Sequence, residues 1–113
     1  MGEERRRVPR YPFVADAVVR DDSSGTTVNT RLSELSLYGC YLDMVNPLPS
    51  GTPITVKVSS GGKFLQASGK VAYAAPNLGI GVSFHHVDVH SLIVLKEWLV
   101  KAAQAKYGPA SAI

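Results

Sequence analysis

The chain has 113 residues, with 12 Lys and Arg against 9 Asp and Glu, and a formal net charge of +3. Hydrophobic residues make up 45% of it and charged residues 19%. This composition excludes a disordered chain and predicts one domain with one hydrophobic core. A net charge this small does not by itself indicate a nucleic-acid polymer as partner. The single cysteine, Cys40, excludes an internal disulfide and a cysteine-based zinc site, and is typical of a reducing compartment.

The apolar runs are too short for a transmembrane helix. The charged N-terminus also lacks the apolar stretch of a signal peptide. We therefore expect a cytoplasmic protein with no membrane span.

Most of the net charge lies in residues 3–10, where four arginines and two glutamates leave +2. These arginines are Arg5, Arg6, Arg7 and Arg10. The planar fork of arginine suits phosphate groups and guanine edges better than the point charge of lysine does. A solvated basic tail is the ordinary interpretation of such a cluster. However, Pro9 and Pro12 stiffen the segment, and Tyr11 and Phe13 are apolar enough to anchor it. We therefore predict a binding element.

The middle of the chain alternates apolar and polar residues in short runs separated by turn residues, which is typical of β-strands. Strands are predicted at 13–20, 28–33, 40–44, 54–59, 63–74 and about 80–84. In the fifth strand, Leu65, Ala67, Val71 and Tyr73 share one face, and Gly69 indicates a bulge or bend. In the sixth, Ile80, Val82 and Phe84 face inward.

The period becomes helical after Asp88, a good N-cap residue. Leu92, Leu95, Leu99 and Ala102 then follow at helical spacing, which predicts a helix over residues 89–107. Gly108 and Pro109 end it.

Together these elements predict a mainly β protein, a six-stranded antiparallel (split) β-barrel with one C-terminal α-helix. We expect a flexible Arg-rich segment over residues 1–12, the barrel and helix over 13–107, and a tail over 108–113.

Residues 34–39 read Glu-Leu-Ser-Leu-Tyr-Gly, an acid-x-Ser-x-x-Gly pattern. In an extended segment, the side chains of Glu34 and Ser36 project to the same face. Gly39 lets the backbone turn or approach a ligand closely. A carboxylate beside a hydroxyl can read donors on a nucleobase edge. Alone, this pattern occurs often by chance.

Combined with Arg6-x-x-x-Arg10 upstream, the pattern resembles the PilZ domain family, bacterial receptors for the second messenger cyclic di-GMP. That family carries Arg-x-x-x-Arg near its N-terminus, followed by Asp or Asn-x-Ser-x-x-Gly. The stretch 79–84 also resembles the Gly-rich strand that precedes the helix in the family. The resemblance covers about residues 5–105. One departure is Glu34, whose side chain is one methylene longer than the family's Asp.

The resemblance implies a role for each motif residue. Arg6 and Arg10 would grip guanine and phosphate, Glu34 and Ser36 would contact the guanine edge, and Gly39 would keep space open. Arg5 or Arg7 would add a phosphate contact, with Arg5 preferred. It also implies a non-enzymatic receptor without a cofactor. Ligand-induced ordering of the Arg-rich segment would signal to a downstream protein partner, from a monomer or a homodimer holding one or two ligands.

Two other functions remain open. Glu34 motivates a degenerate PilZ-like protein-interaction module that does not bind cyclic di-GMP. A barrel that binds single-stranded nucleic acid ranks last, because its basic residues would be spread along one face.

Other chemistry has weaker support. His85, His86 and His90 lack the companions of a metal site, and no nucleophile has a plausible base, so no enzyme is expected. Cys40 and Trp98 are interpreted as packing residues.

Overall fold

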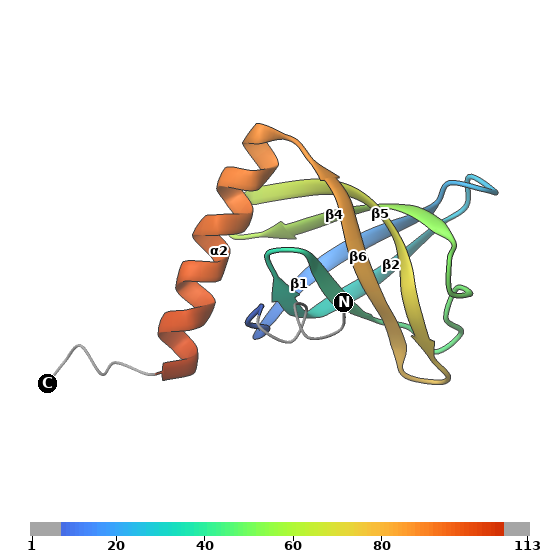
Figure 1. The fold of residues 1–113 in the computed structure, drawn as a ribbon, viewed down its shortest axis with the longest axis horizontal. Helices are drawn as coiled ribbons and strands as arrows, with labels where there is room; N and C mark the ends of the chain where they lie inside the picture. The colour runs from blue at the N-terminus through green and yellow to red at the C-terminus, as the bar shows by residue number, and fades with distance from the viewer. Residues whose placement is uncertain (1–7, 108–113) are drawn as a thin grey trace, which may run out of the picture.

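The computed structural model describes residues 8–107, and over that range the chain forms six β-strands and one α-helix. The strands are β1 (Tyr11–Asp21), β2 (Thr27–Ser36), β3 (Gly39–Asp43), β4 (Pro53–Ser60), β5 (Lys63–Ala75) and β6 (Gly79–Val87). They pair antiparallel and close into a barrel in the order β1-β2-β3-β6-β5-β4. The helix, α2 (Val89–Tyr107), stands at one end of this barrel (Figure 1). The predicted fold class is therefore confirmed.

The strand β1 begins earlier than the hydrophobic alternation predicts. Tyr11 pairs with Leu35 and Pro12 pairs with Glu34, so both residues belong to the barrel and not to the N-terminal segment. Backbone pairing continues here because ladder hydrogen bonds depend on the main chain and not on side-chain polarity. The expected tail at 108–113 and the first seven residues of the Arg-rich segment lie outside the described residues.

The barrel interior is filled by aliphatic side chains from all six strands. Their alternation with outward-facing residues follows the period of two expected for strands around a core. Among the strands, the most deeply buried side chains are those of Val19, Leu32, Leu35, Leu42, Ile54, Val56, Val58, Leu65, Val71 and Ile80. Val82 is buried among them, and Phe84 is half-buried against the same core.

The prediction that Tyr73 shares a face with Leu65, Ala67 and Val71 is wrong. Tyr73 is 44% exposed, because the pairing between β5 and β6 shifts register between Val71 and Tyr73. One extra residue in a strand moves every following side chain to the opposite face. The same pair of strands shifts register between Ser68 and Gly69, which confirms the irregularity predicted at Gly69.

A register shift in another strand pair sets the orientation of β2. The pairing between β2 and β3 shifts between Leu32 and Glu34, and Leu32 and Leu35 are consequently both fully buried. With Leu35 inward, its neighbours Glu34 and Ser36 face outward on the same side of the strand. The bulge thus turns both polar residues away from the core.

The helix α2 is fixed to the barrel at its first turn and at its middle. The Asp88 carboxylate accepts a hydrogen bond from the Ser91 N–H at 2.8 Å, which lowers the pKa of Asp88 and confirms the predicted N-cap. The Ser91 hydroxyl accepts a hydrogen bond from the backbone N–H of Gln66 in β5 at 2.9 Å. Further along, Trp98 is 3% exposed and stacks on Phe13 of β1, with ring centroids 5.3 Å apart. Trp98 is therefore a packing residue, as predicted.

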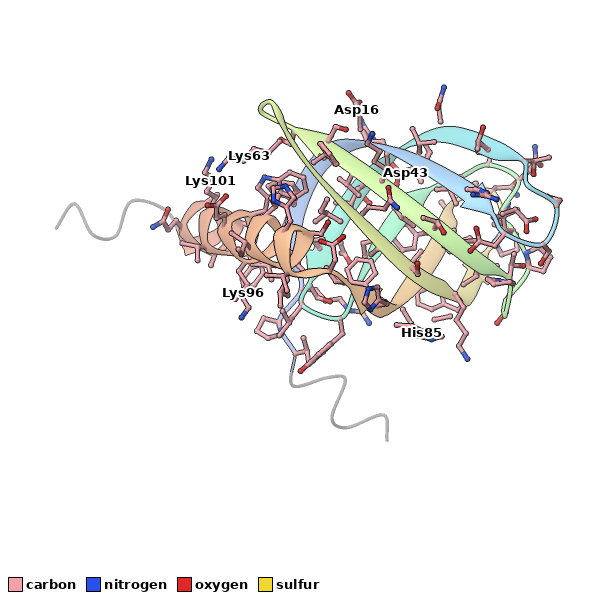
Figure 2. The ribbon with its side chains drawn as sticks, turned by 90° about the horizontal axis from the view of Figure 1, so that it is seen from above. Asp16, Asp43, Lys63, His85, Lys96 and Lys101 are labelled. Atoms are coloured by element: carbon pink, nitrogen blue, oxygen red, sulfur yellow. The ribbon has the colours of Figure 1, made fainter. Side chains whose placement is uncertain are left out.

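Polar contacts on the surface reinforce this docking. Lys63, at the start of β5, forms a 2.7 Å ion pair with Glu97 of α2 and points to the helix side in Figure 2. Both side chains are about half exposed, so the pair contributes little free energy. Among the described residues, no helix is long and apolar enough to cross a membrane.

We predict that Leu42→Ala lowers the free energy of unfolding by about 2–5 kcal/mol, because it leaves a cavity in the core. Leu42 is fully buried, whereas Leu78, in the turn before β6, is 67% exposed. The same substitution at Leu78 should change stability by less than about 0.5 kcal/mol. Urea unfolding followed by circular dichroism measures both, and equal losses would contradict the assigned core.

Candidate functional site

A cavity of about 660 Å³ lies beside the β2–β3 turn. Its size falls within the usual range of small-molecule sites, about 300–1,000 Å³. The wall combines the residues just before β1 with parts of β2, β3, β5 and β6. It is lined by Val8, Arg10, Glu34, Leu35, Ser36, Tyr38, Gly39, Cys40, Tyr41, Ala72, Tyr73, Gly81, Val82, Ser83 and Phe84.

The strand pairing explains why Arg10 of the first motif meets the second motif here. Tyr11 pairs with Leu35, so Arg10 lies next to the end of β2 that carries Glu34 and Ser36. Arg10, Glu34, Ser36 and Gly39 all line the cavity. The other three arginines singled out in the sequence, Arg5, Arg6 and Arg7, lie outside the described residues.

The two charged residues of the cavity have unused bonding capacity. Arg10 and Glu34 are exposed, and neither side chain forms a hydrogen bond or ion pair with another described residue. A guanidinium presents up to five N–H donors and a carboxylate presents only acceptors. The cavity therefore offers a cation and an anion to a ligand on the same wall.

Ser36 has a structural contact of its own. Its hydroxyl donates to the carbonyl oxygen of Gly39 at 3.2 Å and accepts from the N–H of Tyr38 at 3.3 Å. The Tyr38 carbonyl in turn accepts a hydrogen bond from the N–H of Phe84 in β6 at 2.8 Å. The motif serine thus shapes the β2–β3 turn, which is held against β6 and forms one wall of the cavity.

Gly39 is required by the barrel itself. A Cβ atom at this position would overlap the carbonyl oxygen of Val82 in β6. A backbone oxygen in a paired strand cannot move aside without disturbing the ladder. The family resemblance implies that Gly39 leaves space for a ligand. In the structure, β6 fills the space beside the Cα atom of Gly39.

Two tyrosines in the cavity wall were not found as site residues from the sequence. Tyr41 of β3 and Tyr73 of β5 both pair with Gly81 of β6, one from each side. Their ring centroids are 6.3 Å apart, with an angle of 35° between the rings. The available signal was the Gly79-x-Gly81 spacing, because glycines on one face of a strand leave room for aromatic rings from its neighbours.

The electrostatic environment favours neutral forms of two cavity residues. Burial raises the pKa of the Tyr41 phenol, and the neighbouring Tyr73, Asp43 and Glu34 raise it further. Tyr41 is consequently a hydrogen-bond donor at neutral pH. Burial also raises the pKa of the Cys40 thiol, which keeps it protonated and therefore a poor nucleophile.

Metal binding has no support in the part of the chain that the structure describes. Over residues 8–107, no group of three or more His, Cys, Asp or Glu side chains is arranged to hold a metal ion. His85 and His86 are both exposed near the end of β6.

The fold and the site define a small antiparallel β-barrel domain with a cavity that brings Arg10 of the first motif together with the second motif. The PilZ domain family model matches residues 4–101 of the sequence. The chain therefore belongs to the PilZ domain family. Comparison with curated protein sequences returns no match.

Solved structures of low sequence identity share the fold. The PilZ domain with c-di-GMP of YcgR from Escherichia coli has a TM-score of 0.70 and 16% identity, over 96% of this chain and 99% of that one. The PilZ domain of CeSA from a cellulose-synthesizing bacterium has a TM-score of 0.65 and 18% identity, over 82% and 96%. The Bacillus subtilis inhibitor of motility (MotI/DgrA) has a TM-score of 0.72 and 12% identity, over 89% of this chain. The present chain spans only 52% of that last protein.

We predict that Gly39→Ala destabilises the fold by about 1–3 kcal/mol, the usual cost of forcing an extra methyl group into a packed region. Gly81→Ala is the matched comparison, since the Cβ atom there would meet the exposed ring of Tyr73. That ring can swing away, whereas the β6 backbone opposite Gly39 cannot. Thermal unfolding should therefore show a clearly larger loss for Gly39→Ala, and an equal or smaller loss would contradict the assigned role of Gly39.

Proposed function

We propose that this PilZ domain binds cyclic di-GMP in the cavity beside the β2–β3 turn and acts as a non-enzymatic receptor. The observation that carries the proposal is the meeting of Arg10, from the first motif, with Glu34 and Ser36, from the second, in one cavity. The structural similarity to the PilZ domain of YcgR, solved with c-di-GMP, supports it.

The residue types match the chemistry of this ligand. Cyclic di-GMP presents two guanines and two phosphates. The Arg10 guanidinium can form two parallel hydrogen bonds to guanine O6 and N7 or clamp a phosphate. The Glu34 carboxylate can accept from the N–H groups on the opposite guanine edge. Because neither side chain has a hydrogen-bond or ion-pair partner among residues 8–107, neither must break a contact with another described side chain in order to bind.

The remaining arginines are assigned by the motif. Arg6, with Arg5 and Arg7 beside it, precedes the described residues by a short stretch of chain. We propose that these side chains close over the ligand. Arg6 would grip guanine and phosphate together with Arg10, and Arg5 or Arg7, with Arg5 preferred, would add a phosphate contact. We expect a partner protein to detect the ordering of this segment. We also expect the domain to act in the cytoplasm, as a monomer or as a homodimer.

We propose a route from the cavity to the helix. Arg10 lies three residues before Phe13, whose ring stacks on Trp98 of α2. A change in the path of the chain at Arg10 would reach α2 through this contact. Trp98 is the only tryptophan of the sequence, so its fluorescence reports on the contact directly.

We predict that isothermal titration detects cyclic di-GMP binding, and that Arg10→Ala weakens it by about 5-fold to 150-fold. That factor corresponds to about 1–3 kcal/mol for one good bidentate contact. The control is Arg20→Ala, which removes the same charge from an exposed residue near the other end of β1 and should leave affinity unchanged. No heat from the unaltered protein at high micromolar ligand would contradict the proposal, as would equal losses in the two variants.

A second candidate function is motivated by Glu34. Its side chain is longer than the Asp or Asn of the family motif, and a displaced head group would weaken binding. In that case the domain would be an interaction module that binds only protein.

Titrating Glu34→Asp separates the two candidates. We predict that cyclic di-GMP binds Glu34→Asp and the unaltered protein with similar affinity, because the carboxylate is exposed and free to adjust. Glu97→Asp, on α2 and away from the cavity, is the matched control. Binding only after Glu34→Asp would favour the degenerate module.

A further inference from the structure

The outward face of β6 differs from that of the other strands around the cavity. Its residues Ile80 and Val82 point into the core, while Gly79 and Gly81 occupy the alternate, outward positions. Two outward side chains are therefore missing from the first part of this strand. The rings of Tyr41 and Tyr73, from the strands on either side, fill the space.

The Tyr73 ring lies so close over β6 that the position beneath it cannot carry a side chain. A Cβ atom at Gly81 would overlap three carbons of the Tyr73 ring, so the ring covers the Gly81 backbone. The residue is nonetheless 44% exposed. Tyr73 also lines the cavity, so the ring is accessible on a side that β6 does not cover.

Tyr41 continues the same surface. It is half-buried, and a Cβ atom at Gly79 would come within 2.9 Å of its ring. The two rings meet at a shallow angle of 35° with centroids 6.3 Å apart. They thus form a nearly continuous aromatic surface, on the same cavity wall as Glu34 of the neighbouring strand.

We infer that Tyr41 and Tyr73 form an aromatic floor on which a purine ring of the bound nucleotide stacks. This inference rests on the proposed function and assigns to these residues a role that neither sequence motif contains. A purine has a planar π-face that packs well on aromatic side chains. When the base lies on this floor, Arg10 and Glu34 at the cavity wall can form hydrogen bonds with its edge. Arg10 can alternatively contact a phosphate.

The aromatic floor and the polar residues should affect different properties of binding, namely affinity and base preference. Stacking on an aromatic ring tolerates any base, because every base has a π-face. Hydrogen bonds to the base edge discriminate guanine from adenine. Loss of the floor should therefore weaken binding without changing base preference.

Variants at one exposed position test the floor in the whole protein. Tyr73→Leu should weaken cyclic di-GMP binding by about 5-fold to 150-fold, the range found when a stacking aromatic is removed. Tyr73→Phe keeps the ring and should retain affinity. Phe64→Leu is the matched control, since Phe64 is 46% exposed on the same strand and does not line the cavity.

Gly81→Ala provides an independent test without touching a tyrosine. The added methyl group should lift the Tyr73 ring from β6 and weaken binding, and combining it with Tyr73→Leu should cost little more than either change alone. Full affinity in Tyr73→Leu, with loss in Arg10→Ala, would overturn the floor while the proposed function stands. A loss in Phe64→Leu as large as that in Tyr73→Leu would also overturn it.

A second measurement keeps the inference testable if cyclic di-GMP does not bind. Guanosine and adenosine monophosphate are titrated at millimolar concentration, and the ring protons of the tyrosines are followed by NMR. Upfield shifts at Tyr41 and Tyr73 with both nucleotides, and none at Phe64, would support the floor even where the proposed function fails. No shift at the two tyrosines with either nucleotide would overturn it.

Discussion

The strand β6 lies so close to both of its neighbours that the positions at the contact cannot carry a side chain. A Cβ atom at Gly39 would overlap a β6 carbonyl, one at Gly79 would overlap a carbonyl of β3, and one at Gly69 would overlap another carbonyl of β6. Glycine at these three positions allows β6 to join β3 to β5 and so close the barrel. Closure leaves no open strand edge in the described sheet.

The cavity depends on the same closure. Because β6 is held close, its backbone can bond to the β2–β3 turn through Phe84 and Tyr38. The turn then stands as a wall beside Glu34 and Ser36. The glycines of β6 also leave its outer surface bare, which is why tyrosine rings from both sides can lie there. A packing requirement of the barrel thus creates the surface that we propose as the nucleotide floor.

Much of the fold follows from local patterns in the sequence. The six strands and the helix were predicted because each has a clear hydrophobic period and is bounded by turn residues, and Asp88 marked the start of α2. The motif residues Arg10, Glu34, Ser36 and Gly39 could be selected because the two patterns together resemble the motifs of the PilZ family, although the second pattern alone occurs often by chance. The predicted face of Tyr73 was wrong, because an extra residue in a strand cannot be recognised from the hydrophobic alternation.

The sequence by itself determined the class of fold, the order of its elements and most of the candidate ligand-binding residues. Each of these depends on the type and spacing of residues close together in the chain. Only the tertiary structure decided that Arg10 meets Glu34 in one cavity, that Gly39 is required by β6, and that Tyr41 and Tyr73 share its wall. These relations depend on strand register and on backbone separation between distant segments, which are set when the barrel closes and not by local preference.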